Sequence, residues 1–185
     1  MPTSTPWLRP DSATRYGSVS RLFHWTMAFC FALMFAAALA HFFAKDTPVY
    51  ELLWPLHRPT GTLLMLLVVL RAAWALLHAS QRPPHLSQAA RLGHLALYAL
   101  MLAVPCIGLL RQYGSARGFA PWGIPLMEAR GEKIEWMTDL GRLLHGKLGW
   151  VLLACVLGHV AMALWHRRSG DTNVLPRMIG SGEAN

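Results

Sequence analysis

The sequence predicts an all-α membrane protein built as a bundle of four transmembrane helices. Of its 185 residues, 54% are hydrophobic and only 14% are charged, so the chain is more apolar than an ordinary soluble domain. Four apolar stretches are each about 20 residues long, the length that a helix needs to cross a hydrocarbon core of about 30 Å. These stretches fill so much of the chain that we expect a single membrane domain over 1–185.

The four predicted spans are joined by connections of different length. The first span has a longer apolar run than a cleavable signal peptide normally has, so we expect it to remain in the mature protein. A long connection over 112–145 precedes the last span. Within it, a mixed-charge helical pattern from about Glu128 to Leu144 predicts a short interfacial helix. The spans cover about 22–43, 58–78, 92–111 and 146–166.

The distribution of charge predicts the orientation of the bundle. The N-terminal tail, the link after the second span and the C-terminal end hold many arginines, whereas most acidic residues lie in the other two connections. Because cytoplasmic segments of membrane proteins carry an excess of Lys and Arg, we expect the tails 1–20 and 170–185 to be cytoplasmic. The basic residues surround apolar runs, so the net charge of +8 fits the headgroups of a lipid bilayer and not nucleic acid.

Four histidines fall at two depths of the predicted bundle. His145 and His159 are 14 residues apart on the last span, so they share one helix face and lie about 21 Å apart along its axis. In the predicted orientation, His24 is near the cytoplasmic side with His159, and His57 is near the opposite side with His145. We call His24 and His159 the inner layer, and His57 and His145 the outer layer.

Two such layers are the arrangement that holds two haems one above the other. A low-spin b-type haem takes two neutral imidazoles on opposite sides of its iron, and a histidine inside a membrane span is otherwise costly. We therefore predict that His24 and His159 bind the inner haem iron and that His57 and His145 bind the outer haem iron. No Cys-x-x-Cys-His motif occurs in the sequence, so no c-type haem is expected.

The other five histidines are expected to have different roles. His94 lies near the inner end of the third span and could replace either inner ligand, an alternative that the spacing leaves open. His166 lies at the water boundary, where it is better placed for a headgroup, a haem propionate or a quinone carbonyl than for iron. His41, His78 and His85 are expected at the interface or in solvent.

Arginines and glycines accompany the predicted ligands. Arg71 near the inner end of the second span and Arg111 at the outer end of the third are candidates for binding haem propionates, because a planar guanidinium suits carboxylates. Contact with lipid phosphate is the alternative for both. Several glycines leave room for a macrocycle or for a neighbouring helix: Gly61, Gly93, Gly108, Gly146, Gly149 and Gly158.

The order and spacing of several segments resemble the bacterial cytochrome b-561 family of dihaem membrane proteins, most closely its superoxide oxidase member. The resemblance runs from about residue 15 to 179. The matching pieces are Arg21-Leu22-Phe23-His24-Trp25, Leu56-His57 with Arg71, Leu92-Gly93-His94 through Pro105-Cys106-Ile107-Gly108-Leu109, Leu144-His145 through Gly158-His159, and Asp171 through Met178.

The resemblance implies a superoxide:ubiquinone oxidoreductase of the bacterial inner membrane. It implies two haem b groups on the same four histidines, superoxide as the electron donor at the outer face and ubiquinone as the acceptor at the inner side. It also implies an outer catalytic site that attracts an anion, for which Arg58, Arg142 and Lys147 lie near the outer ligands in the sequence.

Two other functions stay open. Related families use the same haem layout in a cytochrome b subunit that transfers electrons for a hydrogenase or a periplasmic dehydrogenase, which would require a periplasmic redox partner. A remoter alternative is a haem-free membrane protein whose histidines carry metal or protons. The sequence gives neither the haem potentials nor the oligomeric state.

Overall fold

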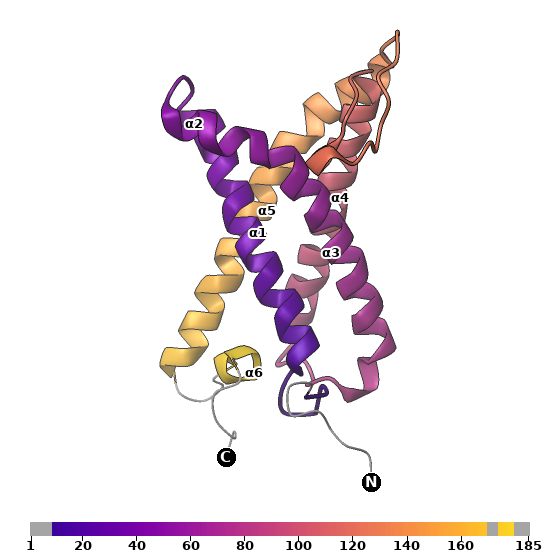
Figure 1. The fold of residues 1–185 in the computed structure, drawn as a ribbon. Coiled ribbons are helices and arrows are strands. Elements are labelled where there is room, and N and C mark those ends of the chain that lie inside the picture. Colours follow the sequence, from indigo (N-terminus) through magenta and orange to yellow (C-terminus); the bar gives the residue numbers. More distant parts are fainter. Residues whose placement is uncertain (1–8, 170–173, 180–185) are drawn as a thin grey trace.

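A computed structural model describes residues 9–169 and 174–179, and within them it contains helices and no β-strand (Figure 1). Four helices are long and apolar enough to cross a membrane, which confirms the predicted fold class. They are α1 (Ser18–Phe43), α3 (His57–Leu77), α4 (Gln88–Gly114) and α5 (Glu135–Ser169). The short elements are α2 (Pro48–Leu53), η1 (Trp54–Leu56), η2 (Ala79–Gln81), η3 (Pro121–Gly123) and α6 (Leu175–Ile179).

The outer surfaces of the long helices are apolar. In the most apolar window of each spanning segment, only 6–22% of the residues are buried inside the chain. Large hydrophobic side chains therefore face outward, such as Phe29 at 71% exposure, Leu76 at 78% and Leu157 at 60%. Such extended apolar surfaces are stable against hydrocarbon and unfavourable in water, so this is an integral membrane protein.

The buried core lies between the two histidine layers. The most extensive helix packings are α4 against α5, α1 against α3, and α3 against α4. Met27, Leu64, Val68 and Leu152 are each at most 3% exposed and form one cluster. Leu152 is seven residues from both His145 and His159, so this cluster separates the outer layer from the inner layer.

The fourth long helix begins earlier than the sequence predicted. From Glu135 onward, the helical pattern assigned to a separate interfacial helix is the first part of α5 and continues into the span without a break. Residues 115–134 form an irregular connection. Gly141 and Gly146 did not end the helix, because a glycine inside a helix costs only about 1 kcal/mol relative to alanine. His145 consequently lies well inside α5 and not at its start.

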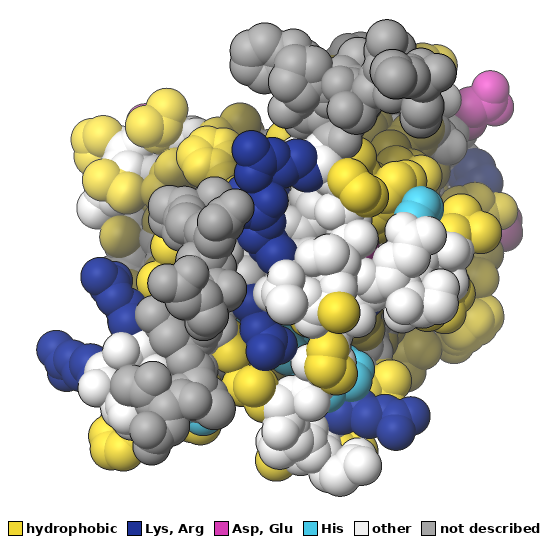
Figure 2. Space-filling model, turned by 90° about the horizontal axis from the view of Figure 1, so that it is seen from below, with side chains coloured by type: hydrophobic (Ala, Val, Ile, Leu, Met, Phe, Trp, Pro, Cys, Tyr) yellow, Lys and Arg dark blue, Asp and Glu magenta, His cyan; other side chains and the backbone are white. Residues whose placement is uncertain are grey.

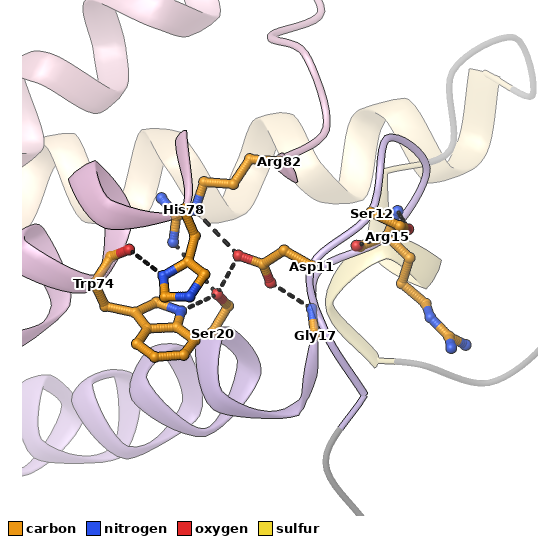
Figure 3. A network of polar contacts seen from close by, with 8 residues as sticks. All are labelled: Asp11, Ser12, Arg15, Gly17, Ser20, Trp74, His78 and Arg82. Atoms are coloured by element: carbon orange, nitrogen blue, oxygen red, sulfur yellow. Dashed lines mark hydrogen bonds and ion pairs between the residues drawn. The ribbon is translucent and has the colours of Figure 1, made fainter. Parts of the chain in front are cut away.

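A buried carboxylate ties several segments together at the inner end of the bundle (Figure 3). Asp11 accepts hydrogen bonds from the Gly17 backbone N–H at 2.6 Å and from the Ser20 hydroxyl at 2.8 Å. Nε of Arg82 forms an ion pair with the same carboxylate at 3.3 Å. The indole N–H of Trp74 donates to the Ser20 hydroxyl at 3.0 Å. The network joins the N-terminal segment to α1, to α3 and to the link after α3.

Replacing Asp11 with alanine is expected to destabilise the protein by about 3 kcal/mol, because the partly buried Arg82 guanidinium loses its counter-charge and two donors lose their acceptor. Unfolding of the purified protein by SDS in mixed micelles measures the change. Asp11→Asn keeps an acceptor for Ser20 and should lose less. Equal stability of Asp11→Ala and wild type would show that the network does not hold the inner end together.

The short helix α6 contacts the beginning of α1. Backbone carbonyls at the end of a helix have no partner within it, so they need donors from elsewhere. The carbonyls of residues 177, 178 and 179 accept hydrogen bonds from the Tyr16 N–H, the Trp25 indole and the Arg21 guanidinium, at 3.2, 3.1 and 3.3 Å. Segment 9–17 and α6 therefore lie at the same end of the bundle (Figure 1). The rest of the two predicted tails, 1–8, 170–173 and 180–185, lies outside the described residues.

Candidate functional site

The structure brings the four predicted histidines together as two facing pairs. The ring centroids of His57 and His145 are 6.1 Å apart with planes at 79°, and those of His24 and His159 are 6.3 Å apart with planes at 61°. An imidazole nitrogen binds a transition metal at about 2 Å and lies about 1 Å from its ring centre, so two rings on opposite sides of one metal have centres about 6 Å apart. Both spacings fit a metal between the rings.

These pairs suit axial ligation better than a bare metal site. Among the described residues, no cluster of three or more His, Cys, Asp or Glu could hold a metal ion. Two imidazoles leave the remaining coordination positions to another group, and a porphyrin fills these positions. The donor set in each layer therefore fits a haem.

His145 is held in the tautomer that binds metal. Its Nδ1 donates a hydrogen bond to the backbone carbonyl of Val104 on α4 at 3.0 Å. The other ring nitrogen, Nε2, is then the unprotonated one, and a carbonyl partner of this kind also fixes the orientation of a ligating ring. Gly108 makes the contact possible, because a Cβ at this position would lie only 2.8 Å from Cε1 of His145.

Gly108→Ala is expected to lower the outer haem content to less than about half of the wild-type value, because the added methyl displaces the His145 ring in a packed interface. The inner haem should be retained. Haem stoichiometry and the redox-resolved α-band measure both. Gly131→Ala is the control, because a Cβ there meets no atom within 4 Å and the residue lies in the connection between α4 and α5. Equal outer haem loss in both variants would contradict a specific role for Gly108.

His57 is held by ring stacking. Its Nδ1 is buried and has no hydrogen-bond partner among the described residues. The ring stacks on Trp54, with centroids 5.0 Å apart and planes at 27°. Trp54 stacks in turn on His41 at 3.9 Å and 15°, so the half-buried His41 is part of an aromatic stack, although the sequence placed it at the interface. The three-residue spacing between Trp54 and His57 was the overlooked signal, since such residues share a helix face.

The inner layer places Arg71 against a predicted ligand. Its guanidinium lies 3.4 Å from Nδ1 of His24, and it forms no ion pair with a described residue. An arginine only donates hydrogen bonds, so in this arrangement Nδ1 of His24 is the acceptor and Nε2 carries the proton. Binding of iron through Nε2 would require this contact to break, which would free Arg71 for an anion such as a propionate.

His94 also reaches the inner layer. Its ring lies 5.4 Å from that of His159 at 74°, and its Nδ1 donates to the carbonyl of Ala90 in its own helix at 2.7 Å. This centroid distance is shorter than the roughly 6 Å expected for two imidazoles across one metal. The geometry therefore favours His24 over His94 as the partner of His159. His85 lies beside His94 at 5.9 Å and is exposed.

The predicted propionate and quinone residues take different positions. The stem of Arg111 packs against Gly141 of α5, where an added Cβ would overlap it, and Arg111 forms no ion pair with a described residue. His166 is half-buried near the end of α5, seven residues beyond His159 and on nearly the same helix face. At the inner end, burial raises the pKa of the Tyr16 phenol, although the neighbouring Arg82 acts in the opposite direction.

The three predicted outer cations are separated by the structure. Arg58 donates to the side-chain carbonyl of the buried Gln112 at 3.1 Å, and no acid among the described residues pairs with it. Arg142 forms an ion pair with Asp139. Arg142 and Lys147 are exposed on the surface of α5, and Lys147 is about 200° around that helix from His145. Arg58 is therefore the predicted cation that lies beside the outer layer without a counter-charge.

Two comparisons with known proteins agree with each other. A family model described as prokaryotic cytochrome b561 matches residues 15–181, a range that contains both histidine layers. A protein of Escherichia coli strain K12 named cytochrome b561 homolog 2 is 30% identical over 185 residues. That alignment covers 95% of this chain and 96% of the E. coli protein.

Proposed function

Because this chain belongs to the prokaryotic cytochrome b561 family, it is a transmembrane b-type cytochrome that transfers electrons, and we propose that it is a superoxide oxidase which reduces ubiquinone. The observation that carries this proposal is the pair of histidine layers, whose facing rings are 6.1 and 6.3 Å apart. They lie about 21 Å apart along α5, so an electron accepted near one membrane face can be delivered near the other.

The chain's own residues would hold two b haems. His57 and His145 would hold the outer haem, and His24 and His159 would hold the inner haem. When bound, each haem supplies a one-electron carrier. The Val104 carbonyl keeps Nε2 of His145 available for iron, and Arg71 and Arg111, which have no acid partner among the described residues, are the proposed propionate partners.

Superoxide is an anion, and the outer layer offers an uncompensated cation. Arg58 follows His57 in the sequence, and its guanidinium donates a hydrogen bond to the side chain of Gln112, which holds it in place. A local positive field raises the encounter rate of a small anion, and Arg58 would act directly at the outer site. We assign Arg142 and Lys147 a weaker part in the same field, since Arg142 is paired with Asp139 and Lys147 lies about 200° around α5 from His145.

Ubiquinone would accept electrons near the inner layer, with His166 as a candidate partner for its carbonyl. We propose that this end faces the cytoplasm of a bacterium with an inner membrane. Figure 2, which views this end, shows several Lys and Arg side chains across the face and acidic side chains only at its edge. This bias supports a cytoplasmic placement of both termini, because cytoplasmic segments are enriched in Lys and Arg.

One observation favours the alternative of an electron-transfer subunit for a hydrogenase or a periplasmic dehydrogenase. The connection over 115–134 exposes large apolar side chains, with Trp122 at 61%, Ile124 at 58% and Leu126 at 51%. Exposed apolar patches commonly mark sites of protein–protein interaction. A periplasmic redox partner could bind there.

Rapid mixing of the purified oxidised protein with superoxide separates the two functions. A superoxide oxidase shows haem reduction well above the chemical background, followed by reoxidation with a soluble ubiquinone, and superoxide dismutase abolishes the first step. Arg58→Gln is expected to slow haem reduction about tenfold while leaving reoxidation unchanged, because only the anion encounter loses its cation. Haem that superoxide does not reduce and quinone does not reoxidise would favour the subunit.

A further inference from the structure

We propose that Trp54 is a positioning residue for the outer haem ligand, and that it holds the His57 imidazole crossed to that of His145 with His41 as its backing ring. The inference rests on the proposed haem ligation and goes beyond it, because it concerns the orientation of a ligand and not its identity. The three stacked rings belong to the outer end of α1, to η1 and to the first residue of α3.

The two outer ligands are oriented by different means. The plane of His145 is fixed by the hydrogen bond from its Nδ1 to the Val104 carbonyl at 3.0 Å. His57 has no such bond, and its buried Nδ1 has no partner among the described residues. A ring without a hydrogen bond can turn about its Cβ–Cγ bond unless a neighbouring group blocks the rotation. Trp54, stacked on the imidazole at 5.0 Å and 27°, is the group that blocks it.

Helical spacing and a second helix keep Trp54 in place. Tyr50, Trp54 and His57 stand at positions i, i+4 and i+7, so their side chains share one face, and the Tyr50 and Trp54 rings lie 6.0 Å apart with planes at 21°. His41 comes from α1 and covers Trp54 at 3.9 Å and 15°. An indole held by three aromatic neighbours cannot swing aside without losing several ring contacts.

The orientation of axial imidazoles has a spectroscopic signature. The angle between the two ligand planes sets the splitting of the iron d orbitals, so crossed planes give a strongly anisotropic low-spin ferric EPR signal and parallel planes a more rhombic one. The planes of His57 and His145 are 79° apart. If Trp54 maintains this angle, its removal should change the EPR signal of the outer haem.

The test compares ferric EPR spectra and haem midpoint potentials of the full-length purified haem protein. The variants are Trp54→Leu, which removes the stack, Trp54→Phe, which keeps a stacking ring, and His41→Leu, which removes the backing ring. Trp150→Leu is the matched control, because Trp150 lies on α5 near the outer layer and its ring contact is with Phe42 at 5.6 Å. The inner-haem signal of each variant reports that the protein is folded.

In Trp54→Leu we expect the outer-haem signal to become broader and less anisotropic and its potential to shift, with the inner-haem signal unchanged. His41→Leu should show a smaller change in the same direction, whereas Trp54→Phe and Trp150→Leu should match wild type. A wild-type outer signal in Trp54→Leu would overturn the inference. If Trp54→Leu loses the outer haem, a wild-type signal in Trp54→Phe supports the inference, and loss in both variants overturns it.

These outcomes are distinguishable from a failure of the proposed function. A wild-type protein with only one low-spin haem, or with none, would refute the two-haem proposal before any substitution is made. If the wild-type protein holds two haems and the EPR signal of the outer haem does not change in Trp54→Leu, only the positioning role is refuted.

Discussion

His145→Ala is expected to reduce the haem content from about two per chain to about one, with loss of the outer haem and retention of the inner haem. His145 is the proposed ligand whose tautomer is set by a backbone carbonyl, Val104, so its loss leaves His57 without an opposing imidazole. Electron entry from superoxide should fall about 100-fold, since loss of the outer haem removes the acceptor nearest to Arg58. Redox titration of the α-band and rapid mixing with superoxide measure the two effects.

The control for this variant is His85→Ala, an exposed histidine outside both layers. It should retain both haems and the wild-type rate of reduction. Loss of the inner haem alone in His145→Ala would overturn the assignment of layers, because His145 faces His57 and not His24 or His159. A full complement of both haems in His145→Ala would exclude His145 as a ligand.

His159→Ala is expected to remove the inner haem while the outer haem still accepts electrons from superoxide. The variant should therefore separate haem reduction by superoxide from haem reoxidation by ubiquinone. Haem reduction should stay near the wild-type rate, and reoxidation by ubiquinone should fall about 100-fold, because the carrier nearest to the inner side is absent. Double mixing, first with superoxide and then with a soluble quinone, measures both rates in one sample.

The same measurement decides between His24 and His94. The His24–His159 centroid distance of 6.3 Å fits two imidazoles across iron, whereas the His94–His159 distance of 5.4 Å is short for this arrangement. We therefore expect His94→Ala to keep the inner haem and His24→Ala to lose it. The reverse result would assign the inner ligands to His94 and His159, and would leave His24 as the partner of Arg71.

The fold could be predicted from the sequence because the bilayer imposes a length requirement. A helix must supply about 20 apolar residues to span the hydrocarbon, and all its backbone groups must bond internally, so apolar run length alone identifies the four helices. The beginning of α5 at Glu135 could not be predicted in this way. Helix termini outside the hydrocarbon depend on caps and on packing of neighbouring loops, which weak propensities do not determine.

Part of the candidate site could also be predicted from the sequence. Helical periodicity places His145 and His159 on one face, and the predicted orientation adds His57 to the first and His24 to the second. The structure does bring these rings together, although their role as ligands stays a prediction. The stack of His41 and Trp54 on His57 was missed, because it depends on how the end of α1 meets η1.

The sequence by itself determined the number of spanning helices and the two depths at which histidines occur, because the first follows from the length of the apolar runs and the second from the spacing on the last span and the alternating direction of the spans. Only the tertiary structure decided which groups of other elements contact these rings: a Val104 carbonyl contacts His145, a guanidinium contacts His24, and His41 covers the indole that is stacked on His57. It also decided that Arg58 has no acidic partner among the described residues while Arg142 has one. The reason is physical. Hydrogen bonds and ring contacts act over a few ångströms between different helices, and helix packing alone sets those distances.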